Sequence, residues 1–183
     1  FNTDGVGFWD NVRKHGVDIK GKKLTLIGCG GAGSAVLVQA ALDGMTEIDV
    51  FEMAEGNGMK NAKELAPKLL EKTGCKVNLF VTGDMEALAA SIQSSDVLVN
   101  SSPVGMGEGC TDTPVPAELI KPGSVVADTV YFPRETQLIN DARAKGCTVV
   151  GGLGMMIEQA AVGEEIWYGI KMDTDMIERE LYS

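Results

Sequence analysis

The sequence predicts an α/β protein in which a doubly wound parallel sheet of six strands is followed by C-terminal helices. Short apolar runs of strand length alternate along the chain with longer segments of helical periodicity. A glycine-rich turn separates the first apolar run from the first long helical segment. Alternation of this kind produces parallel strands that are covered by helices on both faces.

The elements follow from these patterns in order. Strands are expected at residues 24–27, 48–51, 75–81, 96–100, 124–128 and 147–150. Helices are expected at residues 7–14, 35–42, 59–72, 85–92, 135–145, 155–170 and 173–181. Residues 2–5 have the composition of a turn, and the glycines of residues 104–109 indicate a loop.

Two residues mark local features of these elements. Pro67 falls inside the helix expected at 59–72, where it must either kink the helix or start its second half. Asp84 precedes the helix expected at 85–92, and aspartate is a residue type that caps helix N-termini.

Composition limits the classes of function. The 183 residues suffice for one domain with an appendage, and a net charge of −10 gives no general attraction to nucleic acid or anionic membranes. No apolar run reaches membrane-spanning length. The four cysteines include no CxxC pair, which argues against zinc and favours reduced thiols in a cytoplasm. We expect no metal site. The single histidine, His15, falls where a helix is expected to end, and a histidine in such a position is more often a cap-region residue than a catalytic one.

Three glycines, Gly28, Gly30 and Gly33, have the spacing of the dinucleotide fingerprint. In a strand–turn–helix unit the first glycine permits the tight turn, the second lets the backbone approach a pyrophosphate, and the third lets helix and strand pack closely. The free N–H groups at the start of the helix then face the phosphates. The predicted sheet is therefore Rossmann-like. The alternative is a glycine turn that binds no ligand.

The second strand ends in acidic residues that bear on the choice of cofactor. A carboxylate here can accept hydrogen bonds from an adenosine ribose, whereas a 2′-phosphate usually needs an arginine. The segment contains Glu52 and Glu55, no arginine, and no lysine before Lys60. Because two carboxylates repel a phosphate dianion, we expect NAD in preference to NADP, even if one of the glutamates is a solvated loop residue.

Polar residues follow other strands at the same edge of the sheet. Ligands of open α/β sheets bind at the carboxyl ends of the strands. Asn100-Ser101-Ser102-Pro103 follows the fourth strand and is expected near the glycine turn. The same four residues also have the composition of a simple turn.

Several separated motifs resemble the shikimate dehydrogenase family, and the sequence that flanks them is most similar to its quinate/shikimate dehydrogenase branch. The likeness covers nearly the whole chain and concerns the cofactor-binding portion. The motifs are Asn2-Thr3-Asp4-Gly5-x-Gly7-Phe8, Gly28-x-Gly30-Gly31-Ala32, Asn100-Ser101-Ser102-Pro103-Val104-Gly105-Met106, Asp128-x-Val130-Tyr131-x-Pro133 and Gly152-Leu153-Gly154-Met155-Met156 with Gln159-Ala160.

The resemblance implies roles for individual residues. The family's catalytic pair is a lysine from an N-terminal substrate domain and an aspartate that falls on Asp4; the lysine has no counterpart here. Substrate-binding roles are implied for Thr3, Asp4, Tyr131 and Gln159. Cofactor-binding roles are implied for Gly28, Cys29, Gly30, Gly31, Ala32, Glu52, Glu55, Asn100, Thr129 and Gly152. NADP-using members carry Asn-Arg where this chain has Glu52-Met53, which agrees with the electrostatic preference for NAD.

The chain opens at Phe1 without a methionine, so we expect that an N-terminal substrate domain is missing. Residues 1–20 would then be a connecting helix from that domain, residues 21–170 the dinucleotide-binding domain, and residues 171–183 a C-terminal helix. These 183 residues alone are expected to bind NAD without catalysing turnover.

The first functional hypothesis is an NAD-preferring oxidoreductase of a cyclic hydroxy acid. It would interconvert shikimate, and in some members quinate, with the 3-dehydro acid by hydride transfer. The alternative is a stand-alone dinucleotide-binding regulatory module, and a third hypothesis is a related dehydrogenase of a different cyclic hydroxy acid. We expect neither a nucleic-acid nor a membrane partner, and keep a homodimer open.

Overall fold

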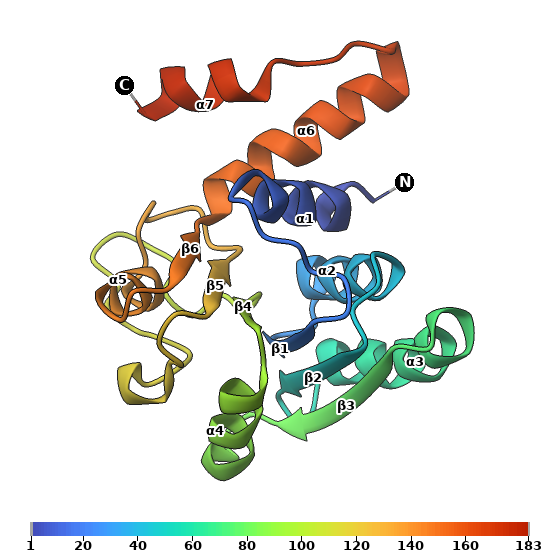
Figure 1. Cartoon of the computed structure of the whole chain (residues 1–183), viewed down its shortest axis with the longest axis vertical. Coiled ribbons are helices and arrows are strands. Elements are labelled where there is room, and N and C mark those ends of the chain that lie inside the picture. Colours follow the sequence, from blue (N-terminus) through green and yellow to red (C-terminus); the bar gives the residue numbers. More distant parts are fainter. Residues whose placement is uncertain (1, 183) are drawn as a thin grey trace.

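The computed structural model describes residues 2–182, with side chains through residue 181, and contains one six-stranded parallel sheet (Figure 1). Its strand order is β3-β2-β1-β4-β5-β6. The strands are β1 (Lys23–Ile27), β2 (Glu47–Glu52), β3 (Lys76–Val81), β4 (Val97–Asn100), β5 (Val125–Asp128) and β6 (Thr148–Val150). The predicted fold class, a Rossmann-like doubly wound sheet, is confirmed.

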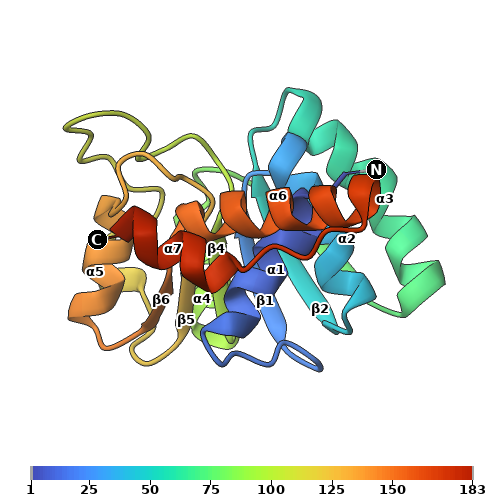
Figure 2. The same cartoon turned by 90° about the horizontal axis from the view of Figure 1, so that it is seen from above.

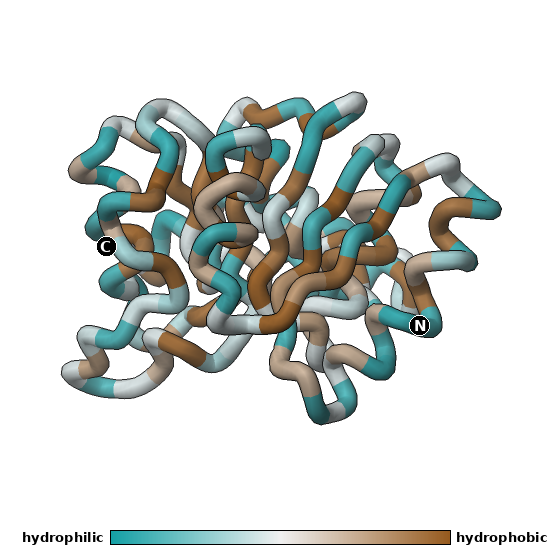
Figure 3. The backbone as a smooth tube through the Cα atoms, turned by 90° about the horizontal axis from the view of Figure 1, so that it is seen from below, coloured by the Kyte–Doolittle hydropathy of each residue, from teal (hydrophilic) through white to brown (hydrophobic). Residues whose placement is uncertain are grey.

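Helices connect the strands and cover both faces of the sheet. They are α1 (Asp4–Lys14), α2 (Gly31–Leu42), α3 (Asn57–Thr73), α4 (Met85–Ser94), α5 (Gln137–Ala144), α6 (Gly152–Tyr168) and α7 (Thr174–Tyr182). A short 3₁₀ helix at Ala117–Leu119 was not predicted. The hydrophobic colouring in Figure 3 follows the strands through the middle of the molecule, and the hydrophilic colouring gathers in the peripheral helices and loops.

The order of the strands reverses at β1, and this reversal positions the ligand crevice. In parallel register, Ile27 of β1 pairs with Phe51 of β2 on one side and with Asn100 of β4 on the other. The chain leaves β1 towards β2 and β3, and then returns to the opposite side of β1 for β4, β5 and β6. In open α/β sheets the crevice beyond such a switch point holds the ligand.

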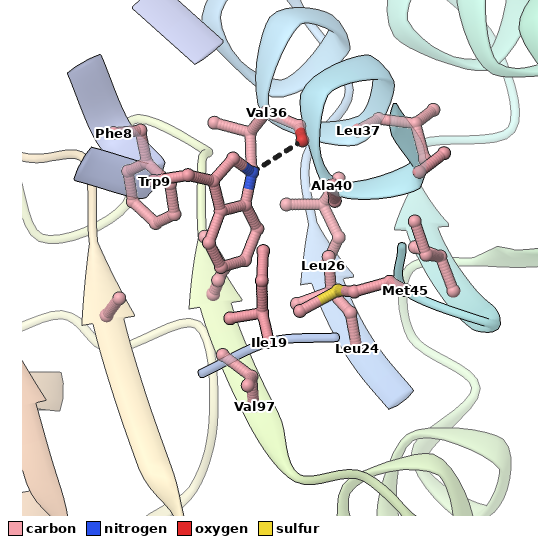
Figure 4. Close-up of a cluster of buried hydrophobic side chains, with 14 of the residues drawn as sticks. Phe8, Trp9, Ile19, Leu24, Leu26, Val36, Leu37, Ala40, Met45 and Val97 are labelled. Carbon is pink, nitrogen blue, oxygen red and sulfur yellow. Dashed lines mark hydrogen bonds between the residues drawn. The ribbon is translucent and has the colours of Figure 1, made fainter. Parts of the chain in front are cut away.

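One core cluster attaches α1 to the sheet (Figure 4). Phe8 and Trp9 of α1 are buried together with Leu26 of β1 and Val36 of α2. The indole Nε1 of Trp9 donates a hydrogen bond to the carbonyl oxygen of Val36 at 2.9 Å. Figures 1 and 2 show α1 between the sheet and α6, with α7 outside α6. A second cluster, which includes Leu98, packs on the α4 and α5 side.

The turn predicted at residues 2–5 is wrong, because α1 begins at Asp4. Two glycines allow this helix to pack without intervening side chains. A Cβ at Gly5 would lie 2.3 Å from the carbonyl oxygen of Ala35, and one at Gly7 would lie 2.4 Å from the backbone nitrogen of Gln159. Tertiary packing therefore overrides the low helix propensity of glycine.

Other boundaries differ by a few residues. Helix α6 begins at Gly152 instead of 155, and α3 continues through Pro67. The predicted cap at Asp84 is confirmed, since its Oδ1 accepts a hydrogen bond from the backbone N–H of Ala87 at 3.0 Å. None of the helices in the described part of the chain combines the length and apolar character needed to cross a membrane.

Candidate functional site

The glycine turn between β1 and α2 has a distinct geometric reason for each glycine. Gly28 has φ of +87°, and a Cβ there would lie 2.8 Å from the carbonyl group of Ser101. A Cβ at Gly33 would lie 2.4 Å from the carbonyl oxygen of Gly28, so this glycine allows α2 to start directly against the strand end. By contrast, Cβ atoms at Gly30 and Gly31 would meet nothing within 4 Å. These two residues leave their backbone open to a ligand.

The turn borders a cavity of about 400 Å³ at the carboxyl ends of β1 and β2, which we call the β2 cavity. Its lining includes Gly28, Gly30, Glu52, Gly58 and Ser101. The cavity has the position at which an adenosine half would lie, because the ribose of a dinucleotide approaches the end of the second strand.

Glu52 connects the end of β2 to the glycine turn. Its Oε2 accepts a hydrogen bond from the backbone N–H of Cys29 at 2.7 Å, and its Oε1 accepts one from the N–H of Met53 at 2.8 Å. The Cys29 side chain is fully buried beside Ser34, and burial raises the pKa of its thiol. Glu55, the other predicted carboxylate, is exposed in the loop between β2 and α3.

A second cavity of about 280 Å³, which we call the β5 cavity, lies beyond β4 and β5. It brings together three of the four residues to which substrate roles were assigned: Asp4 from α1, Tyr131 after β5 and Gln159 from α6. Ala32 and Thr129 also line it. Thr3 does not line this cavity; it precedes α1 and makes no side-chain cap hydrogen bond.

The segment Ser101-Ser102-Pro103 lines both cavities and forms a shared wall between them. The Oγ of Ser101 is buried and has no hydrogen-bond partner, and no other buried side-chain oxygen or nitrogen in residues 2–181 shares this property. A buried hydroxyl without a partner is costly. This unused hydroxyl lies next to Gly33, 3.1 Å from where a Cβ would stand, and Ser101 lines the β2 cavity together with Gly30. Its position fits a site for the polar middle of a dinucleotide.

Asn100 occupies the interior instead of a cavity wall. Its Nδ2 donates to the carbonyl oxygen of Val104 at 3.1 Å and to Oδ1 of Asp128 at 3.0 Å. Its Oδ1 accepts hydrogen bonds from the backbone N–H and hydroxyl of Ser102 at 3.0 and 2.7 Å. All four bonding positions of the amide are used, so Asn100 shapes the shared wall through hydrogen bonds.

Asp128 is a site-organising residue to which sequence reasoning gave no role. The side chain is 1% exposed and accepts hydrogen bonds from Asn100, from the N–H of Val130 at 2.9 Å and from the Thr136 hydroxyl at 2.7 Å. Burial raises the pKa of Asp128 to about 6, although these hydrogen bonds oppose the shift. The sequence contained one indication of this role: Asp128 is an acidic residue at the end of a strand that was expected to be buried.

Gly152 acts through close packing at the start of α6. A Cβ there would lie 2.5 Å from the carbonyl oxygen of Val130 and 2.6 Å from that of Thr129. Gly152 does not line either cavity, but it allows α6 to begin beside Thr129, whose N–H donates to the carbonyl oxygen of Asn100 at 2.9 Å.

His15 lies away from both cavities, at the C-terminus of α1, where its Nδ1 contacts the carbonyl oxygen of Asn11 at 2.9 Å. Within residues 2–182, no three His, Cys, Asp or Glu side chains are grouped so that they could hold a metal ion. Of the described residues that line the β5 cavity, one is acidic, and it is Asp4. It can accept or relay a proton beside a bound alcohol.

No family model matches this chain. Two curated relatives, each named shikimate dehydrogenase (NADP(+)), come from Listeria monocytogenes and Streptococcus pneumoniae. They are 39% identical over 181 residues and 41% identical over 182 residues, or 98% and 99% of this chain. The chain spans 62% of the length of each relative.

Solved structures agree with these relatives. The shikimate 5-dehydrogenase of Listeria monocytogenes in complex with shikimate and NAD matches with a TM-score of 0.92 and 39% identity, covering 98% of this chain and 62% of that one. The quinate dehydrogenase of Corynebacterium glutamicum in complex with NAD matches with a TM-score of 0.84 and 26% identity, covering 100% and 62%.

Proposed function

We propose a function from the premise that this chain belongs with the shikimate dehydrogenase family, as a homologue of its cofactor-binding portion. The proposed function is hydride transfer between a nicotinamide dinucleotide and shikimate, or the related acid quinate. The observation that carries it is the open backbone of Gly30 and Gly31, placed between Glu52 on one side and the Asp4-containing β5 cavity on the other.

The proposed cofactor is NAD in preference to NADP. Glu52 presents a carboxylate in the β2 cavity, where a 2′-phosphate would lie. The segment up to Lys60 has no cation to pair with that phosphate, and Glu55 adds a second negative charge nearby. The curated names of the relatives specify NADP(+), but the Listeria monocytogenes structure holds NAD. The cofactor test therefore compares the two dinucleotides directly.

We propose that Asp4, Tyr131 and Gln159 contact the hydroxy acid in the β5 cavity, and that Thr3 contacts it from the start of α1. The nicotinamide supplies the hydride acceptor when it is bound. Asp4 would take part in removing the hydroxyl proton, together with the lysine that the family resemblance places in an N-terminal substrate domain. Thr129 and Gly152 would shape the nicotinamide end of the dinucleotide site.

We propose the domain boundaries expected from the sequence: a connecting helix in residues 1–20, the dinucleotide-binding domain in 21–170, and a C-terminal helix in 171–183. Residues 1 and 183, at the two ends of the chain, lie outside the described residues. The boundary between residues 170 and 171 is supported by the break between α6 and α7, whereas α1 contributes Trp9 to the sheet core and Asp4 to the β5 cavity. The four cysteines are free, which supports a reducing compartment such as the cytoplasm.

A second candidate function is a dinucleotide-binding module without catalysis. One observation favours it: among the described residues that line the β5 cavity there is no lysine. The described residues of this cavity therefore offer Asp4 no lysine with which to share the proton transfer.

Steady-state assays decide between the two functions. The complete polypeptide that contains this chain is assayed with shikimate and quinate, each with NAD and NADP. Turnover of either acid, faster with NAD, is expected; no turnover with either cofactor would contradict the first function and leave the binding module and the dehydrogenase of a different cyclic hydroxy acid. The 183-residue chain should bind NAD in calorimetry and remain inactive, and measurable dehydrogenation by this chain would contradict the role given to the absent lysine.

A further inference from the structure

Gly58, the second residue of α3, lies against the carboxylate of Glu52. A Cβ at Gly58 would lie 2.0 Å from Oε2 of Glu52, 2.4 Å from its Cδ and 2.9 Å from its Cγ. All three of these atoms belong to the side chain of Glu52, which is flexible; none belongs to the backbone. A methyl group at residue 58 would therefore displace the glutamate and leave the fold in place.

In its present position, from which a side chain at residue 58 would displace it, Glu52 is hydrogen-bonded to the glycine turn. There, its Oε2 accepts the N–H of Cys29, inside the turn that would hold the pyrophosphate. The same carboxylate lies beside the first turn of α3, whose positive end stabilises negative charge. Glu52 and Gly58 both line the β2 cavity.

We propose that Gly58 is a specificity-determining residue: it leaves the space in which the Glu52 carboxylate is held to favour NAD over NADP. This inference rests on the proposed dinucleotide-binding function. No larger residue fits at position 58 while Glu52 keeps its bond to Cys29. The cofactor preference therefore depends on a pair of residues, one that carries the charge and one that makes room for it.

The physical consequence of a side chain at residue 58 concerns the carboxylate alone. Glu52 would turn to another rotamer, lose the charge-assisted hydrogen bond from Cys29 and move its charge away from the ribose position. NAD would lose a preorganised acceptor, and the 2′-phosphate of NADP would meet less repulsion. Both changes lower the ratio of the Kd for NADP to the Kd for NAD.

The test is calorimetric titration of NAD and NADP into the chain and into its Gly58→Ala variant. The expected result is a fall of about tenfold in that ratio, the effect of losing one well-placed charged contact. Gly163→Ala is the matched control, since Gly163 also lies inside a helix and its Cβ would have ordinary contacts at 3.9 Å from Trp167. The ratio should be unchanged in this control.

The same substitution in a Glu52→Ala background separates displacement of the glutamate from a direct clash with the cofactor. With no carboxylate to displace, Gly58→Ala should leave the ratio of the Glu52→Ala chain unchanged. This double variant also lacks the atoms that a Cβ would meet, so it should fold if the single variant does not. A further fall in the double variant would show direct contact with the cofactor and overturn the proposal.

A readout without cofactor is the amide proton of Cys29 in NMR spectra. Its bond to a carboxylate should move the resonance downfield, and Gly58→Ala should remove that displacement. If the original chain prefers NAD and Gly58→Ala keeps the same ratio and the same Cys29 resonance, this inference alone fails. If the original chain binds neither dinucleotide, the proposed function fails with it.

Discussion

At the scale of single residues, Asp128 shows how a buried carboxyl group that lines neither cavity can organise the site through hydrogen bonds. It lies at the carboxyl end of β5 and accepts hydrogen bonds from three donors, one of them Asn100, which in turn holds the wall between the two cavities. The side chain touches neither cavity. Its influence on the site is therefore indirect, through the side chain of Asn100 on one side and the backbone of Val130 and the hydroxyl of Thr136 on the other.

The raised pKa of Asp128 predicts a pH dependence of stability. Because its pKa is about 6 in the folded chain and 3.8 ordinarily, the folded state binds the proton more tightly. The stabilising contribution is fully present below about pH 4 and is lost as the pH rises through about 6, with a total of about 3 kcal/mol. Urea unfolding of the original chain and of Asp128→Asn, from pH 4 to pH 7, measures the difference.

Asp128→Asn imitates the protonated acid in shape and should lack this part of the slope. Equal slopes in the two proteins would show that Asp128 ionises normally. The ¹³C resonance of its carboxyl group gives an independent measure of the titration.

At the scale of elements, the turn between β1 and α2 contains two kinds of glycine: those that pack against neighbouring backbone and those whose Cβ position is open. Gly33→Ala places a Cβ 2.4 Å from the backbone of Gly28, and we expect a loss of about 3 kcal/mol in the free energy of unfolding. Gly31→Ala meets no atom, so its stability should stay within about 0.5 kcal/mol of the original while NAD binding weakens. Chemical denaturation and calorimetry on both variants measure the two effects; equal stability losses would contradict the division.

Helix α7 is attached to α1 and α6 by one ammonium group. Lys14 Nζ lies 2.6 Å from carboxylate oxygens of both Glu158 and Asp175, and it donates to the hydroxyl of Thr174 at 2.8 Å. The ammonium lowers the pKa of Asp175. The guanidinium of Arg134 adds a hydrogen bond to the carbonyl oxygen of Leu181. Among the apolar residues of α7, Met176 and Leu181 are exposed and Ile177 is half-buried, so these polar contacts form a substantial part of its attachment.

Lys14→Met should therefore release α7 selectively. Hydrogen exchange in residues 174–182 is expected to accelerate while that of the six strands stays unchanged. Lys171→Met is the control, because Lys171 is 84% exposed and approaches its partner Glu165 only to 3.8 Å. Unaltered exchange in α7 of the Lys14 variant would show that other contacts hold the helix.

At the scale of the whole molecule, the six strands and their parallel, doubly wound sheet could be predicted because the patterns that indicate them are local. Alternating apolar runs place the strands, and the spacing of Gly28, Gly30 and Gly33 predicts a ligand-binding turn between β1 and α2. The body of α1 was predicted at residues 7–14, but its start at Asp4 could not be predicted from local patterns, because Gly5 and Gly7 are selected by contacts with α2 and α6, which are distant in sequence. The same applies to Asn100, whose hydrogen bonds depend on Asp128 in the neighbouring strand.

The whole molecule should also report cofactor binding through its melting temperature. A ligand that binds only the folded state at 100 times its Kd adds about 2.7 kcal/mol of stability. For a chain of 183 residues this corresponds to a rise of roughly 5–10 °C. Thermal denaturation with equal concentrations of NAD and NADP should show the larger rise with NAD; a larger rise with NADP would reverse the proposed preference.

The wall formed by Ser101, Ser102 and Pro103 has an evolutionary consequence, since the same three residues face both cavities. A substitution that reshapes one cavity here changes the other in the same step. Descendants of this chain that adopt a new acid or a new dinucleotide through this segment must accept both alterations together, whereas changes at Tyr131 or Glu52 can accumulate one at a time.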